Sequence, residues 1–255
     1  MTDPAAPPIS PEERERLLKL ATSASVLVAC VLLAAKLVAW LFTGSVTLLA
    51  SLIDSLMDAL ASVINLFAVR YSLQPADAEH RFGYGKAESL AGLGQATFIA
   101  GSALFLLLEA LDRLLAPEPM AAVGVGVGVM LFAVALTLGL LALQRHVIRR
   151  TGSTAIKADT LHYATDLLTN LGTILALVLA ASGWLVADPL IALAIAGYIL
   201  YSAVGIAREA IDLLMDRELP AETRRRVLEV AFRPAEVRGV HDLRTRQSLD
   251  ELMGG

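Results

Sequence analysis

The sequence has little of several residue types on which soluble proteins depend. Its single cysteine, Cys30, excludes an internal disulfide. Only 18% of its 255 residues are charged, whereas soluble domains have nearer a quarter. Positive charge is not in excess, since the formal net charge is -4, and this argues against a nucleic-acid-binding protein. Aromatic residues make up only 5% of the chain.

What the sequence does contain is six long apolar segments. Hydrophobic residues make up 56% of the chain, and the mean hydropathy is +0.64. A bilayer core of about 30 Å takes about 20 apolar helical residues to cross, and each segment is long enough. The few aromatic residues stand near several segment ends, as in interfacial belts. The segments comprise residues 21–42, 46–69, 89–111, 120–143, 161–181 and 184–207.

Lysine and arginine are distributed unevenly between the two sides of these segments. Of the 21 Lys and Arg residues, 19 lie on one side of the segments. They stand before the first segment, between the second and third, between the fourth and fifth, or after the sixth. Arg113 lies on the other side, and Lys36 lies inside the first segment. Because cytoplasmic loops carry the excess of Lys and Arg, we predict an all-α membrane protein with six transmembrane helices and both termini in the cytoplasm.

Two of the segments carry pairs of ionisable residues. Asp54 and Asp58 are four positions apart in the second segment, so both lie on one helix face. His162 and Asp166 form the same spacing in the fifth, with Asp159 before them at the cytoplasmic end. Each such group in a bilayer core costs about 2.5–3.5 kcal/mol on insertion scales, so two matched pairs indicate a function.

Three carboxylates and one imidazole suit a divalent metal ion. Zn2+ commonly takes four ligands in tetrahedral geometry, while Fe2+, Cd2+ and Mn2+ are alternatives because affinity follows ligand type only loosely. No thiolate joins the set, which argues against copper(I). Metal binding requires deprotonated ligands and so releases protons. The pattern therefore predicts a site that holds either a metal ion or protons.

Other interpretations of the polar pairs are structural contacts between packed helices, an intramembrane protease, and a membrane subunit that binds metal without moving it. A metalloprotease would need His-Glu-x-x-His, which is absent. An aspartyl protease needs two Asp on facing helices, and this would leave His162 beside Asp166 unexplained. We therefore expect no enzyme.

The polar pairs and their surroundings carry a resemblance to a known family. From about Leu18 to Ser248 the chain resembles the cation diffusion facilitators, divalent-metal/proton antiporters, and looks closest to their bacterial ferrous-iron/zinc efflux branch. The stretches that carry the resemblance are SLIDSLMDALASVINLFAVRYSLQPADAEHRFGYGKAESLAGL, ADTLHYATDLLTNLG and GVHDLRTRQS. The combination of Asp-x3-Asp on one span with His-x3-Asp on another is highly specific for the family.

This resemblance implies a function for the whole chain. It implies a homodimer in the bacterial inner membrane that exports Zn2+, with Fe2+, Cd2+ or Mn2+ as alternatives, in exchange for protons, by alternating between inward- and outward-facing states. No organic cofactor and no nucleic acid is expected, and the partners are membrane lipid, metal ions and protons. The transport site would consist of Asp54, Asp58, His162 and Asp166.

The resemblance also assigns secondary positions. Asp77 and His80 match a second metal site in the loop after span two, whose third ligand, usually His, is Tyr84 here. Lys86 and Asp216 match a salt bridge near the dimer interface. His241 matches a ligand of the family's cytoplasmic α/β domain.

The resemblance stops after Ser248, so we expect an incomplete cytoplasmic domain. The division is then a cytoplasmic segment at 1–19, a six-span cation efflux domain at 20–213 and an incomplete dimerisation domain at 214–255. In the last we expect one helix from Pro220 through Phe232, one strand from Val237 to Thr245 and no working metal site at His241. This ending keeps a non-transporting metal-binding or regulatory subunit as the alternative function.

Overall fold

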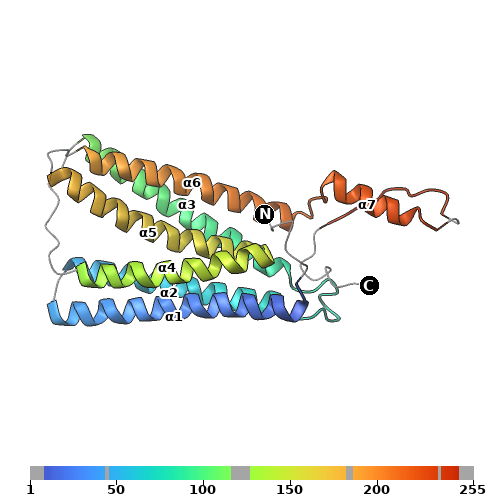
Figure 1. Ribbon diagram of the computed structural model, residues 1–255, viewed down its shortest axis with the longest axis horizontal. Helices are drawn as coiled ribbons and strands as arrows, with labels where there is room; N and C mark the ends of the chain where they lie inside the picture. Colours follow the sequence, from blue (N-terminus) through green and yellow to red (C-terminus); the bar gives the residue numbers. More distant parts are fainter. Residues whose placement is uncertain (1–8, 44–45, 116–126, 182–185, 235–236, 247–255) are drawn as a thin grey trace.

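Six long helices lie side by side in this protein, and a seventh stands apart from them at one end (Figure 1). The computed structural model describes residues 9–43, 46–115, 127–181, 186–234 and 237–246. These residues form seven helices and no strand. The helices are α1 (Pro11–Thr43), α2 (Val46–Ser72), α3 (Lys86–Leu115), α4 (Val127–Thr151), α5 (Thr154–Ala181), α6 (Ala187–Leu214) and α7 (Ala221–Ala231).

The long helices form two groups with α5 between them. Helix α1 packs on α2 and α4, whereas α3 packs most extensively on α6, and α5 contacts α3, α4 and α6 (Figure 1). Successive helices run in opposite directions, so α1, α3 and α5 begin where α2, α4 and α6 end (Figure 1). We call this the α7 end of the bundle, since α7 extends from it.

The long helices carry apolar side chains on their outer surface. Five helical segments within the described residues are long and apolar enough to cross a membrane, namely Pro11–Phe42, Leu52–Ser72, Lys86–Asp112, Leu131–Thr151 and Pro189–Leu214. Large exposed side chains such as Leu27, Phe67 and Phe105 would be unfavourable over so wide an area in water. The structure thus supports five of the six predicted spans, and the span on α5 stays a prediction.

Three buried apolar clusters hold the bundle together, and α5 contributes to each. At the α7 end, one cluster joins α1, α2, α4 and α5 through Leu18, Ala21, Val69, Val147, Ala155 and Ile156. A second joins α5 to α3 and α6, around Leu161 and Ile199. A third joins α5 to α1 and α4, around Tyr163 and Leu140. Helix α5 is therefore fixed on two sides.

Small residues allow α5 to approach its neighbours closely. A Cβ on Gly92 of α3 would lie 3.2 Å from the backbone C and O atoms of Thr154. A Cβ on Gly172 of α5 would lie 2.5 Å from Cδ1 of Ile195 on α6. Packing through small residues is how membrane helices gain contact area, because lipid supplies no hydrophobic force between them.

Ion pairs between helices gather at the α7 end. Arg14 of α1 reaches buried Glu88 of α3 at 3.2 Å, and Arg150 of α4 reaches Glu13 of α1 at 2.9 Å. Lys157 of α5 forms an ion pair with Glu209 of α6. These pairs connect helices from both groups at this end of the bundle.

The tail differs in part from the sequence-based expectation. Helix α7 is confirmed, with Pro220 as its N-cap and Phe232 as its C-cap, and it has no buried residue. The predicted strand from Val237 to Thr245 is wrong, because the described residues 237–246 contain no strand. A strand requires hydrogen bonds to a neighbouring strand, and this part of the chain presents none to pair with. The described tail therefore does not form the expected α/β fold.

Candidate metal centre

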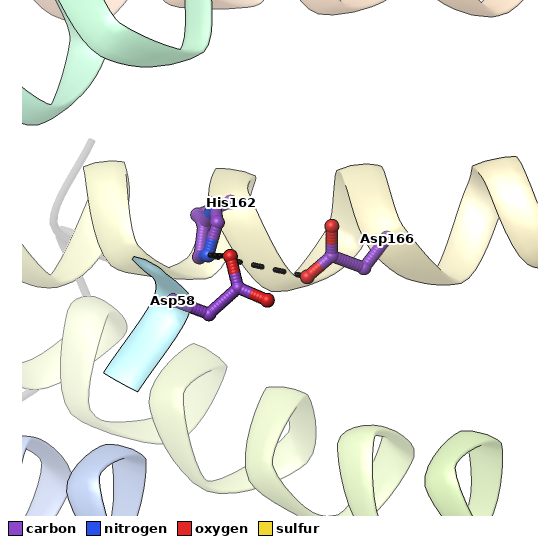
Figure 2. Close-up of side chains that lie close together, drawn as sticks. All are labelled: Asp58, His162 and Asp166. Carbon is purple, nitrogen blue, oxygen red and sulfur yellow. Dashed lines mark ion pairs between the residues drawn. The ribbon is translucent and has the colours of Figure 1, made fainter. Parts of the chain in front are cut away.

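The two helices that carry the predicted ligand pairs bring three of the four side chains together. Nε2 of His162 lies 3.1 Å from Oδ1 of Asp58 on α2 and 4.0 Å from Oδ2 of Asp166 on α5 (Figure 2). One potential ligand atom from each residue lies within 4.8 Å of the other two. The i, i+4 spacing places His162 and Asp166 on one face of α5, and that face is directed at Asp58.

The three side chains of this group differ in exposure. The side chain of His162 is 9% exposed, that of Asp58 26% and that of Asp166 43%. At 1.5 Å rise per residue, Asp166 lies about 6 Å further along α5 than His162. Asp166 is therefore the most exposed member of the group and His162 the least.

Asp54, the fourth predicted ligand, is exposed and stands outside this group. It lies one turn before Asp58 on α2, and its charge repels that of Asp166. Its side chain has two rotatable torsions, so its carboxylate can change position without movement of the helix. The structure thus assembles a three-residue group with a further carboxylate beside it.

Lys36 is a charged neighbour of the group that sequence reasoning did not assign. Its Nζ donates a hydrogen bond to Oγ of buried Ser55 at 2.5 Å, which places an ammonium on α1 beside the ligand helix α2. Its charge attracts the carboxylate of Asp166. Lys36 is the only charged residue in the first apolar segment, and a charge inside such a segment indicates a functional position.

The donor set fits a borderline divalent cation. One imidazole nitrogen and two carboxylates are ligands that Zn2+ takes, and three protein ligands leave one tetrahedral position for a fourth ligand or water. Hydrated Mg2+ or Ca2+ would instead favour an all-oxygen set. The group can therefore hold a transition-metal ion such as Zn2+ or Fe2+.

The loop between α2 and α3 brings Asp77, His80 and Tyr84 together. Tyr84 donates its hydroxyl to Oδ2 of Asp77 at 2.6 Å. Oδ1 of the same carboxylate accepts the backbone N–H groups of Glu79 at 2.9 Å and His80 at 2.6 Å. The hydrogen bond from Tyr84, then that from the backbone of His80, lowers the pKa of Asp77. The bond to Asp77 raises the pKa of Tyr84 to about 12.

The Lys86 and Asp216 side chains meet within one chain. Nζ of Lys86 donates to Oδ2 of Asp216 at 2.9 Å and to the backbone oxygen of Leu214 at 3.1 Å. The ammonium of Lys86 lowers the pKa of Asp216. The pair connects the start of α3 to the end of α6 at the α7 end, and a role at a dimer interface stays a prediction.

His241 lies exposed in the tail. Within the part of the chain that the structure describes, Asp58, His162 and Asp166 form the single group of three or more potential metal-ligating acids, histidines or cysteines. The expectation that His241 holds no metal in this chain stays a prediction.

Apolar helices around a carboxylate–imidazole group define a class, that of membrane proteins that handle metal cations. The sequence profile described as "Cation efflux transmembrane domain" matches residues 23–215. The chain belongs to the cation diffusion facilitator family, in its ferrous-iron/zinc efflux branch.

Curated relatives agree with this assignment over most of the chain. The "Cation-efflux pump FieF" of Klebsiella pneumoniae is 52% identical over 233 residues, which cover 91% of this chain and 78% of the relative. The pumps of the same name from Yersinia enterocolitica and Escherichia coli O139:H28 are each 51% identical, with the same coverage. The chain is thus a transmembrane cation efflux transporter and not an enzyme.

Proposed function

We propose that this transporter exports Zn2+ from the cytoplasm in exchange for protons, by alternating access, with residues 20–213 as the transport unit. The observation that carries the proposal is the contact between α2 and α5, where Nε2 of His162 lies 3.1 Å from Oδ1 of Asp58. The relatives' printed name, a cation-efflux pump, supports the direction of transport. Fe2+, Cd2+ and Mn2+ remain alternative substrates of the same ligands.

In this proposal Asp54, Asp58, His162 and Asp166 are the transport ligands. Asp58, His162 and Asp166 hold the ion, and Asp54 completes a tetrahedral set by turning its side chain toward the group. Release of the ion leaves carboxylates close together in a medium of low dielectric constant. Their mutual repulsion favours proton uptake, and the protons must leave again before the next ion binds.

The distribution of Lys and Arg supports the orientation. The α7 end carries the cations that the positive-inside rule assigns to the cytoplasm, and the transporter would lie in the bacterial inner membrane with both termini inside. Lys86 and Asp216 would then lie on the cytoplasmic side, as would the loop with Asp77 and His80. A homodimer belongs to the proposal through the resemblance to the family.

Transport into proteoliposomes tests the proposal. The purified chain is reconstituted with a pH-sensitive dye inside, and Zn2+, Fe2+, Cd2+ or Mn2+ is added to the outside. We expect Zn2+ uptake accompanied by alkalinisation of the lumen, as protons leave. Uptake without proton movement would refute antiport, and tight Zn2+ binding without uptake would favour the non-transporting subunit.

A further inference from the structure

Asp159 is a buried carboxylate between the metal centre and the α7 end. It lies three positions before His162 on α5, about 4.5 Å nearer that end, and its side chain is fully buried. It accepts hydrogen bonds from three side chains. The donors are Oγ of Ser25 at 2.5 Å, Nε2 of Gln144 at 2.7 Å and Nε2 of Gln95 at 3.1 Å.

These three donors come from three different helices. Ser25 lies on α1, Gln95 on α3 and Gln144 on α4, so one carboxylate connects α5 to members of both helix groups. Gln144 also donates to Oγ of Ser25 at 3.0 Å. The adjacent Tyr163 donates to the backbone oxygen of Ser25 at 3.0 Å and shares a hydrogen bond with Ser62 of α2.

A dry apolar layer lies beyond this network toward the α7 end. Its members come from α1, α2, α4 and α5, and each is 0% exposed: Leu18, Ala21, Val69, Val147, Ala155 and Ile156. The most exposed member of the metal centre, Asp166, lies further from the α7 end than His162 does. In the described conformation, the helices α1, α2, α4 and α5 are therefore packed closed at the α7 end.

We propose that Asp159 is a positioning residue of the transport cycle, the hub of a latch that holds α5 against α1, α3 and α4 and closes the α7 end. This inference rests on the proposed alternating access, in which that end must open to admit a cation from the cytoplasm. The latch members are Asp159, Ser25, Gln95 and Gln144. They act on the transported ion through the position of α5, which carries His162 and Asp166.

A carboxylate suits a latch that must open and close. The three side chains that donate to Asp159 are all uncharged, so opening separates no ion pair at this point. When the helices part, water can replace the three donors, because a carboxylate is well solvated. An apolar hub would lose its burial on opening and would gain nothing from water. The carboxylate of Asp159 thus has hydrogen-bond donors both when the latch is closed and when it is open.

Cysteine accessibility tests the latch without requiring transport. Cys30→Ser removes the native cysteine, and Ile156→Cys places a thiol in the dry layer. An impermeant maleimide is applied to inverted and to right-side-out vesicles. In this parent we expect slow labelling from either side. Adding Gln144→Leu or Asp159→Asn should raise labelling in inverted vesicles roughly tenfold, since a hydrogen bond to a charged group is worth at least that factor.

Matched variants separate a latch from general loosening. Thr137→Val changes another buried polar residue of α4, outside the network, and should leave labelling unchanged. Ser25→Ala removes one donor only and should give a smaller increase than Gln144→Leu. In Gln144→Leu and Asp159→Asn, Zn2+ affinity in detergent should be retained because the ligands are kept, while transport slows because closure is impaired.

Unchanged labelling in both Gln144→Leu and Asp159→Asn, with Zn2+ affinity retained, would overturn the latch. So would an equal increase in Thr137→Val. Increased labelling in right-side-out vesicles alone would refute the cytoplasmic orientation of the α7 end, while still showing that the latch closes this end. Loss of transport in the parent would refute the proposed function, yet the labelling result would still decide whether Asp159 closes this end.

Discussion

The hydroxyl of Tyr84 donates a hydrogen bond to the carboxylate of Asp77, with 2.6 Å between Tyr84 Oη and Asp77 Oδ2. The imidazole of His80 packs on the same phenol ring, 4.3 Å between centroids, with its Nδ1 3.7 Å from Asp77 Oδ1. With two backbone N–H groups on its other oxygen, the Asp77 carboxylate is satisfied by protein donors. Both oxygens of this carboxylate therefore have protein donors in the described loop.

Titration can measure this hydrogen bond directly. The pKa of Tyr84 is raised to about 12, so its phenol should ionise later than an ordinary tyrosine. In a tyrosinate absorbance titration, the difference between the parent and Tyr84→Phe should show one phenol that titrates near that value. Asp77→Asn should bring this titration to lower pH. A Tyr84 transition near pH 10 in the parent would show that the bond does not form.

The loop between α2 and α3 should lose stability only at low pH. Because the folded pKa of Asp77 is lowered, its stabilising contribution is present above the ordinary pKa and is lost as the pH falls through the lowered folded value. Limited proteolysis of the loop should therefore stay slow at pH 5 and accelerate well below pH 4. Tyr84→Phe should bring the onset of acceleration to higher pH, because the first cause of the lowered pKa is removed.

Replacing Tyr84 by histidine should create metal affinity in the loop. Tyr84→His exchanges a neutral phenol for an imidazole beside Asp77 and His80, and a carboxylate with two imidazoles is a common Zn2+ donor set. Calorimetry in an Asp58→Ala background, which removes the main centre, should show Zn2+ binding that the Tyr84 parent lacks. Tyr84→Phe is the control. Equal Zn2+ binding by all three proteins would show that the loop already binds metal with Tyr84 in place.

The metal centre predicts an order of severity among its variants. Asp58→Ala or His162→Ala should reduce Zn2+ transport to the level of empty liposomes, because each removes one of three grouped ligands. Asp54→Ala should retain weaker transport, since water can replace a ligand that stands apart. Asp77→Ala should have the smallest effect. Parental rates in both Asp58→Ala and His162→Ala would refute the transport site, provided that membrane insertion is unchanged.

The positive charge of Lys36 should make the metal centre less negative. Three ionised carboxylates and one ammonium give a net charge of -2, which a divalent cation neutralises. Lys36→Gln makes the empty centre more negative, so we expect tighter Zn2+ binding and slower release, with lower KM and lower kcat. Lys36→Arg keeps the charge and serves as the control. Unchanged KM and kcat in Lys36→Gln would show that its charge does not reach the ion.

Much of the metal centre could be predicted from sequence because helical spacing fixes faces. The four-residue interval alone places His162 and Asp166 together, and charge inside an apolar segment marks Asp58. Side-chain rotation is not encoded in spacing, so the separation of Asp54 was not foreseen. The contacts of Asp159 could not be read either, because Ser25, Gln95 and Gln144 lie on three other helices.

The tail shows a different limit of sequence reasoning. A strand was predicted from Val237 to Thr245, yet a strand forms only by hydrogen bonding to a neighbouring strand. Helix α7 was predicted correctly because a helix satisfies its own backbone and Pro220 marks its start. Secondary structure could be predicted from the sequence where its hydrogen bonds join residues close together in the chain.

The packing of α5 also limits how the chain can vary. From Ser153 to Tyr163, every residue except Lys157 and Thr160 is buried, so this stretch has no face toward lipid. On the outer face of α1 or α3, one apolar residue can replace another at little cost. In a saturation mutagenesis screen for metal resistance, the first three turns of α5 should therefore tolerate the fewest substitutions, at positions that bind no ion as well as at those that do.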